Sequence, residues 1–243
     1  MRTLIIVPSV KRLSAPDWLF DMNRQYDVLY VDYEASGHYK DYFPKSHSDW
    51  VHPQFSTLNI QGQKWAIVKV LLNDHYDVLD TYDQIGFWDD DLEANCEDIN
   101  YSLVMAEMVG AKMWQMALTQ ESDCYYSILR ENPAASLYRT NFIEIMAPFY
   151  HVSLLPRLKM LLNMYDVSTG WGLDIVAPYL FDTKPVVIHS KAITHPKKEN
   201  SAYDKDAAVA EQHECYKAYR KLAEQFILHP NPETLGQQVY NVF

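Results

Sequence analysis

The chain has 243 residues, of which 48% are hydrophobic, so it can form one large α/β domain or two small ones around a substantial core. Its formal charge of −11 argues against a protein that holds nucleic acid by neutralising phosphates over a broad surface. Cys96, Cys124 and Cys215 are odd in number, widely spaced and without a CxxC pair, which favours neither a disulfide framework nor a zinc site.

The first predicted elements are two strands joined by a helix. Residues 4–7 form an apolar strand that we expect to stop at Pro8 and Ser9, and residues 26–31 form a second strand. Residues 16–25 between them are predicted as a helix, and such a β-α-β start favours a parallel sheet. No Gly-rich phosphate loop follows the first strand, so the usual dinucleotide and P-loop signatures are missing.

The central part of the chain alternates helical and strand patterns. We predict a loop or irregular insertion over residues 37–55, a helix over 64–73, a strand running into residues 89–91, a helix over 97–109 and a strand over 113–118. Residues 119–140 are polar and broken by Pro133, which fits either acceptor-binding loops or a plain surface excursion.

The last third contains two more predicted strands and two helices. We predict a strand over 142–147, a helix over 156–165, a core strand over 185–189 and a C-terminal helix over 204–228. The apolar run at residues 1–8 is too short for a secretory signal and no later run approaches a membrane span, so we expect a soluble, cytoplasmic protein.

Three consecutive carboxylates, Asp89, Asp90 and Asp91, end the apolar run over residues 84–88. Adjacent like charges repel, so they need open solvent or a stabilising partner, and a divalent cation is the sharpest candidate. Alternation along an extended chain turns Asp89 and Asp91 to the same side. The plainer alternative is an acidic turn in which one aspartate caps the next helix. An EF-hand is excluded because its glycine and terminal glutamate are not at the required offsets.

Three later features follow this triplet: Glu144 in an otherwise apolar run, the Gly-Trp-Gly-Leu-Asp segment at residues 170–174, and His189 at the end of an apolar strand. Their order is that of a metal-dependent glycosyltransferase of the GT-A type. The chain resembles the family called domain of unknown function 707 over roughly residues 61–196. The matching pieces are Lys64-Trp65, residues 87–92, Gln115 within 114–118, residues 143–148, residues 171–174 and residues 186–189.

The resemblance implies an α/β fold of GT-A type with a mostly parallel central sheet flanked by helices, made of a Rossmann-like nucleotide-binding half and an acceptor half. Residues 1–200 would be one GT-A-like glycosyltransferase domain, with the helix and tail at 201–243 packed on it. The implied activity moves a sugar from a nucleotide-sugar donor, UDP-sugar by analogy, to an acceptor hydroxyl, with inversion and with Mn²⁺ or Mg²⁺.

For the metal, the resemblance points to Asp89, Asp91 and His189, with His195 as the rival histidine. Carboxylate and imidazole ligands suit these ions, which stabilise a departing diphosphate. A lone histidine beside an apolar strand is more often structural. The residues expected to contact the donor are Lys64, Asp89, Asp90, Gln115, Trp171 and Lys191, with Lys197 and Lys198 as further candidates, although a solvated basic loop also explains the late lysines.

For catalysis, we expect Asp174 to be the general base that removes the proton of the acceptor hydroxyl. The alternative is that Asp174 caps a helix beginning near Ile175, and one residue can do both. Glu144 lies in an apolar run, where an unpaired carboxylate is costly, so it should pair with a buried cation or bind the sugar or acceptor.

Two other functions fit the same residues. Paired aspartates also serve metal-dependent nucleotidyltransferases and phosphohydrolases, and a chain of this fold can bind sugars or nucleotides without catalysis. The acceptor stays open among a growing glycan, a lipid-linked sugar, a small metabolite and a modified nucleobase.

Overall fold

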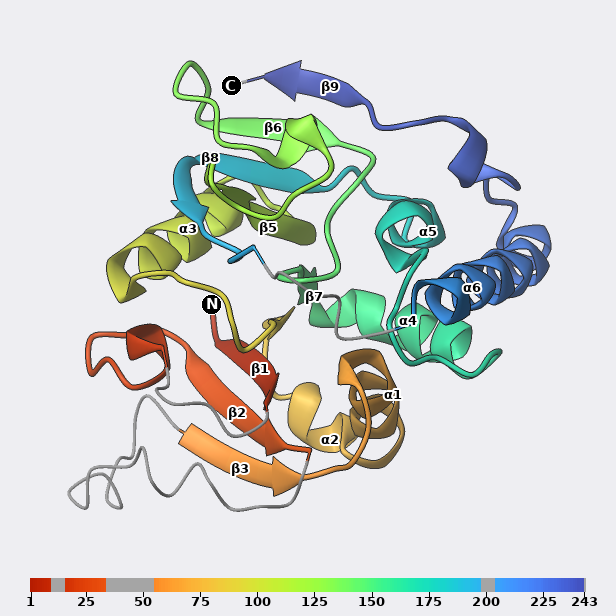
Figure 1. Cartoon of the computed structure of the whole chain (residues 1–243), viewed down its shortest axis with the longest axis horizontal. Helices are drawn as coiled ribbons and strands as arrows, with labels where there is room; N and C mark the ends of the chain where they lie inside the picture. Colours follow the sequence, from red (N-terminus) through yellow and green to blue (C-terminus); the bar gives the residue numbers. More distant parts are fainter. Residues whose placement is uncertain (10–15, 34–54, 198–203, 243) are drawn as a thin grey trace.

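The computed structural model describes residues 1–9, 16–33, 55–197 and 204–242. Its centre is one mixed sheet with the strand order β3-β2-β1-β4-β7-β5-β8-β6-β9 (Figure 1). The strands are β1 (Thr3–Ser9), β2 (Asp27–Asp32), β3 (Phe55–Asn59), β4 (Gln84–Phe87), β5 (Met113–Leu118), β6 (Leu137–Thr140), β7 (Phe149–His151), β8 (Val186–Ile193) and β9 (Val239–Val242).

Most strands run in the same direction, so their carboxyl ends lie at one edge of the sheet. β1 pairs in parallel with β2 and β4, β2 with β3, and β5 with β8. β7 lies antiparallel between β4 and β5, and β6 lies antiparallel between β8 and β9. All described strands except β6 and β7 therefore point the same way. The carboxyl ends of β1, β2 and β4 meet, with Ser9 beside Asp32.

Helices cover both faces of the sheet, with α3 on one face and the α1, α2, α4, α5 and α6 group on the other (Figure 1). The helices are α1 (Lys64–Asp74), α2 (Tyr76–Leu79), α3 (Cys96–Met108), α4 (Leu155–Leu162), α5 (Leu173–Leu180) and α6 (Lys205–Phe226). Successive side chains of a strand point to opposite faces of the sheet, so Ile5 packs into the core on the α3 side and Ile6 into the core on the α1 side.

The predicted α/β fold with a mostly parallel central sheet flanked by helices is confirmed. The predicted helices at 64–73, 97–109, 156–165 and 204–228 correspond to α1, α3, α4 and α6, and the predicted strand at 113–118 is β5. β3, β6, β7 and β9 were not predicted. Most of the loop expected at 37–55 lies outside the described residues.

The helix predicted at 16–25 is wrong, because only Asp17–Leu19 form a short 3-10 turn. Side chains hold this segment in place of helical hydrogen bonds: Trp18 Nε1 donates to Leu92 O at 2.9 Å, and the buried Arg24 Nη1 donates to Leu19 O at 2.7 Å. The apolar residues Trp18 and Leu19 are buried because this loop packs into the core on the α3 side of the sheet.

The strand predicted at 142–147 is also wrong. This segment is a loop between β6 and β7. The carbonyl of Met146 accepts from Asp89 N at 2.8 Å, and the side chain of Gln115 accepts from Glu144 N at 2.6 Å. Its apolar residues are buried, yet several of its backbone groups bond to residues of the candidate site.

Within the described part of the chain, no helix combines the length and the apolar character needed to cross a bilayer.

Candidate functional site

The aspartate triplet continues directly from β4 at the carboxyl edge of the sheet. Trp88 N donates to Ile6 O at 2.9 Å and Asp89 N donates to Met146 O at 2.8 Å, so the chain runs on between β1 and the 142–147 loop. Asp90 accepts a hydrogen bond from Ser9 Oγ at 2.6 Å. The three carboxylates are thus fixed relative to the end of β1.

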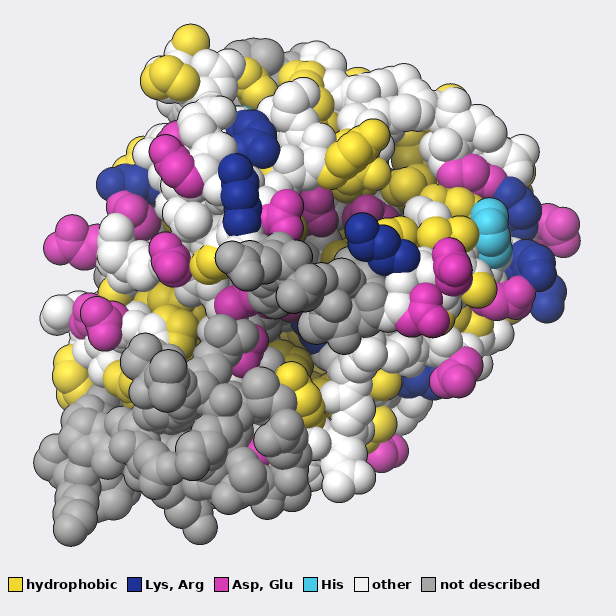
Figure 2. All heavy atoms as spheres, viewed as in Figure 1, with side chains coloured by type: hydrophobic (Ala, Val, Ile, Leu, Met, Phe, Trp, Pro, Cys, Tyr) yellow, Lys and Arg dark blue, Asp and Glu magenta, His cyan; other side chains and the backbone are white. Residues whose placement is uncertain are grey.

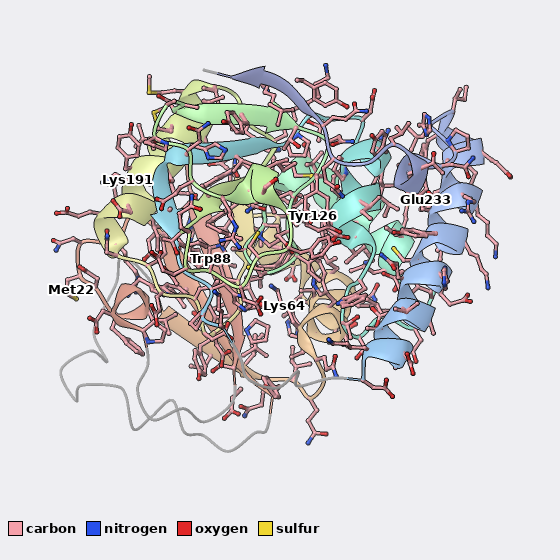
Figure 3. All side chains as sticks on the ribbon, turned by 45° about the horizontal axis from the view of Figure 1, so that its top comes forward. Met22, Lys64, Trp88, Tyr126, Lys191 and Glu233 are labelled. Carbon is pink, nitrogen blue, oxygen red and sulfur yellow. The ribbon has the colours of Figure 1, made fainter. Side chains whose placement is uncertain are left out.

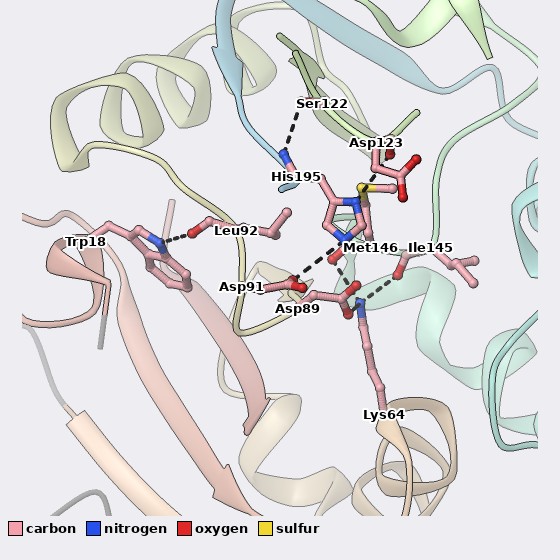
Figure 4. Close-up of polar contacts among 10 residues, drawn as sticks. All are labelled: Trp18, Lys64, Asp89, Asp91, Leu92, Ser122, Asp123, Ile145, Met146 and His195. Atoms are coloured by element: carbon pink, nitrogen blue, oxygen red, sulfur yellow. Dashed lines mark hydrogen bonds and ion pairs between the residues drawn. The ribbon is translucent and has the colours of Figure 1, made fainter. Parts of the chain in front are cut away.

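Asp89, Asp91 and His195 converge on one point (Figure 4). One potential ligand atom from each residue lies within 4.8 Å of the other two, and His195 Nε2 is 3.7 Å from Asp91 Oδ1. Opposite ligands of a single Mg²⁺ or Mn²⁺ ion stand roughly 4.2 Å apart, so small side-chain shifts bring the three atoms to bonding distance. Two carboxylates and an imidazole therefore fit a divalent cation.

His195, not His189, completes this group. Beyond β8, Glu93 N donates to Thr194 O at 2.8 Å, which ties the segment before His195 to the chain that follows Asp91. His195 Nδ1 lies 3.2 Å from the carbonyl of Asp123 (Figure 4). This second contact leaves Nε2 facing the aspartates, as is usual for histidine ligands.

His189 lies elsewhere in the sheet. Its buried ring is 4.0 Å from the ring of Tyr138, measured between centroids, and burial lowers the pKa of His189 to about 4. Its ring is therefore neutral and packed in the core. The pairing of β5 and β8 shifts register after Met116, and β8 runs four residues beyond His189. The sequence does not reveal that extension.

Lys64 places a positive charge inside the acidic group. Its Nζ donates to Asp89 Oδ1 at 2.7 Å, to Ile145 O at 2.6 Å and to Met146 O at 2.9 Å (Figure 4). These bonds use all three donors of the ammonium group. Burial lowers the pKa of Lys64, and the charge of Asp89 opposes that effect. Lys64 therefore joins α1, the triplet and the 142–147 loop.

Glu144 and Asp174 form a second acidic pair next to this group. Burial raises the pKa of Asp174 from 3.8 to about 7, against backbone hydrogen bonds that lower it. Burial also raises the pKa of Glu144, and the charges of Asp174 and Asp89 raise it further, to about 8. Tyr126 lies close to both, since burial and the charges of Asp174 and Glu144 raise its pKa to about 12.

Two glycines place Asp174 at the start of α5. Gly170 has φ +81°, and a Cβ there would lie 2.2 Å from Trp65 Cδ1. Gly172 precedes α5 with φ +96°. Both positions therefore require glycine. α5 begins at Leu173 with Gly172 as its N-cap, so the alternative in which Asp174 caps the helix is wrong. Asp174 lies in the first turn, where its Oδ1 accepts from Ile175 N at 3.0 Å, and its side chain is partly exposed.

Glu211 on α6 is a site residue that the sequence reasoning missed. Its carboxylate accepts hydrogen bonds from Thr169 N at 2.9 Å, Thr169 Oγ1 at 3.0 Å and Gly170 N at 2.7 Å. It thus fixes the turn before Asp174 from more than 40 residues away, and no local pattern could have indicated that partner.

The remaining predicted donor residues fall in different places. Gln115 is fully buried and holds the backbone of Glu144, while the side chain of Trp171 is partly exposed between the two glycines. Lys191 pairs with Asp98 at 2.5 Å beside α3, away from Lys64 and Tyr126 (Figure 3). Lys197 is exposed, and Lys198 lies outside the described residues.

The surface around the site carries no broad basic patch among the residues described on the face in Figure 2. Lysine and arginine side chains are scattered there, and acidic side chains lie across its middle (Figure 2).

Comparison with known proteins identifies the fold. No protein-family model matches the chain, and no curated protein matches it by sequence. Crystal structures of Staphylococcus aureus TarS are similar. The TarS 1–349 complex with UDP-GlcNAc has a TM-score of 0.54 at 13% identity, covering 93% of this chain and 73% of that one. The TarS 1–349 complex with UDP has a TM-score of 0.52 at 12% identity, covering 93% of this chain and 72% of that one. A longer TarS structure has a TM-score of 0.57 at 12% identity, covering 93% of this chain and 40% of that one.

Proposed function

We propose that this chain is a metal-dependent glycosyltransferase that moves a sugar from a nucleotide-sugar donor to an acceptor hydroxyl. The observation that carries the proposal is the convergence of Asp89, Asp91 and His195 at the carboxyl edge of a GT-A-like sheet. In open α/β sheets ligands bind outside the carboxyl ends of the strands. The TarS complexes with UDP-GlcNAc and UDP support a UDP-sugar as the donor.

Asp89, Asp91 and His195 would hold Mn²⁺ or Mg²⁺, whose charge stabilises a departing nucleoside diphosphate. Lys64 fixes the carboxylate of Asp89 and adds a positive charge beside it. Asp90, which accepts a hydrogen bond from Ser9 at the end of β1, would contact the donor's ribose. The partly exposed indole of Trp171 offers an apolar face for a sugar ring.

Asp174 is the proposed general base of an inverting displacement. Its pKa of about 7 leaves a substantial ionised fraction at neutral pH, and that base is strong enough to accept a proton from the acceptor hydroxyl. Once Asp174 is ionised, its charge helps to keep the proton on Glu144, whose pKa is about 8. Glu144 then donates a hydrogen bond to the donor sugar or the acceptor. The two carboxyl groups thus take opposite roles.

Product analysis tests this proposal. The protein is incubated with Mn²⁺, a panel of nucleotide sugars and mixed glycan and small-molecule acceptors, and the nucleotide products are separated. We expect release of a nucleoside diphosphate that depends on Mn²⁺ and falls at least 100-fold in Asp174→Asn. Release of pyrophosphate would instead indicate nucleotidyl transfer. Nucleotide-sugar binding without any product would indicate a binding protein.

A further inference from the structure

A separate cavity of about 400 Å³ lies at the other end of α5 from Asp174. Its lining residues come from α4, from the end of α5 and the segment after it, from the end of α6 and from β9. Asp174 lies in the first turn of α5 and Tyr179 in its last, roughly 7.5 Å further along the helix axis. None of the carboxylates of the candidate site lines this cavity.

The cavity wall carries more positive than negative charge. Arg157 and Lys184 line it together with one carboxylate, Asp182. Arg157 Nη1 donates to Leu180 O at 2.9 Å, and Lys184 Nζ lies 4.3 Å from the ring centroid of Tyr240. Neither cation forms an ion pair with a carboxylate in the described chain. Two cations without a paired carboxylate favour an anionic ligand.

Aromatic rings lie beside these cations. The rings of Tyr179 and His229 are 5.8 Å apart, and the hydroxyl of Tyr179 accepts a hydrogen bond from Asn141 Nδ2 at 2.9 Å. Tyr240 lines the same cavity. Aromatic faces bordered by hydrogen-bonding groups are suited to the apolar face and hydroxyl rim of a sugar ring.

Two helix ends form part of the cavity wall. Ile227 is the C-cap of α6 with φ 55°, and Asp182 follows the C-cap of α5 with φ 49°. Left-handed residues of this kind commonly end helices. Both residues line the cavity, so the wall is built where α5 and α6 stop.

We propose that this cavity binds a small anionic sugar. The sugar ring lies against Tyr179 and His229, and its phosphate or carboxylate pairs with Lys184 and Arg157. The site is separate from the proposed donor site, so its occupancy does not depend on the metal ligands or on Asp174.

Titration calorimetry at low salt tests the proposal with four probes: glucose 6-phosphate, glucuronate, glucose and inorganic phosphate. We expect one of the two anionic sugars to bind at least 10-fold more tightly than glucose and than inorganic phosphate. Lys184→Gln should weaken that binding roughly 10-fold, because a charge-assisted hydrogen bond is lost. Lys221→Gln makes the same charge change on the exposed side of α6 and should leave binding within twofold.

Asp174→Asn distinguishes the cavity from the proposed donor site and should leave probe binding unchanged. The proposal is overturned if neither anionic sugar binds, if inorganic phosphate binds equally well, or if Lys221→Gln weakens binding as much as Lys184→Gln. Loss of binding in Asp174→Asn with retention in Lys184→Gln also overturns it, since the probe would then occupy the carboxylate site. These outcomes leave the proposed glycosyltransferase activity untouched, because none of them measures sugar transfer.

Discussion

Asp174→Asn should make the folded protein more stable while it abolishes sugar transfer. Asparagine keeps the shape of the side chain and its bond to Ile175 N, and it removes a charge that the site disfavours. Burial raises the pKa of Asp174 from 3.8 to about 7. At 1.36 kcal/mol per pKa unit, the ionised carboxylate lowers the free energy of unfolding by up to ~4 kcal/mol at pH 8. Because the side chain is partly exposed, we expect the substitution to recover about 2 kcal/mol of this.

The sign of the effect fixes its pH dependence. A carboxyl whose folded-state pKa is raised contributes stability at low pH and loses it as pH rises toward the folded value. The gain in the free energy of unfolding from Asp174→Asn should therefore be complete above about pH 7 and should decrease to zero as the pH falls toward about 4. Thermal unfolding at pH 8 should show a Tm about 4–8 °C higher than the unmodified protein.

Asp166→Asn makes the same chemical change at an exposed position and should leave the Tm unchanged. If the Tm of Asp174→Asn at pH 8 is equal to or below that of the unmodified protein, burial does not disfavour the ionised form of Asp174. An advantage that grows toward acid pH would refute the reasoning in the same way. Full retention of sugar transfer would remove Asp174 as the base.

Three further variants test how the site is held together. Lys64→Met should lower the free energy of unfolding, measured in urea, by about 2–4 kcal/mol, because one carboxylate and two carbonyls lose their hydrogen-bond donor. The control Lys69→Met loses one hydrogen bond to a carbonyl and should cost about 1 kcal/mol. Equal losses would contradict the bridging role of Lys64. Gly170→Ala should prevent folding or lower the Tm by more than 10 °C, as the new methyl group would overlap the ring of Trp65; a wild-type melting curve would refute this. Glu211→Ala should cost about 2 kcal/mol and lower turnover more than Glu211→Gln, which keeps one acceptor oxygen; identical turnover in the two variants would argue against a positioning role.

Strong local patterns predicted much of this fold from the sequence. The apolar faces of α1, α3 and α6 and the unbroken apolar run of β5 specify their elements without tertiary help. Residues 142–147 looked like a strand because they are apolar, yet their backbone groups bond to Asp89, Lys64 and Gln115. β9 was missed, since an edge strand of four residues has too few positions to show alternation.

The candidate site was predictable where one segment carries its chemistry. Asp89 and Asp91 lie two residues apart just after a buried strand, and Asp174 follows two glycines, so local patterns in the sequence indicate all three. The choice between His189 and His195 depends on how far β8 continues, which pairing with β5 decides. Glu211 lies on a helix whose partner loop is about 40 residues away, and only the folded chain brings them together.

Binding of Mn²⁺ tests the central claim most directly, and electron paramagnetic resonance can count free and bound ions in the presence of UDP. We predict one bound ion per chain, lost in Asp91→Asn and in His195→Ala and retained in His189→Ala. Retention of the ion in His195→Ala together with its loss in His189→Ala would contradict the account.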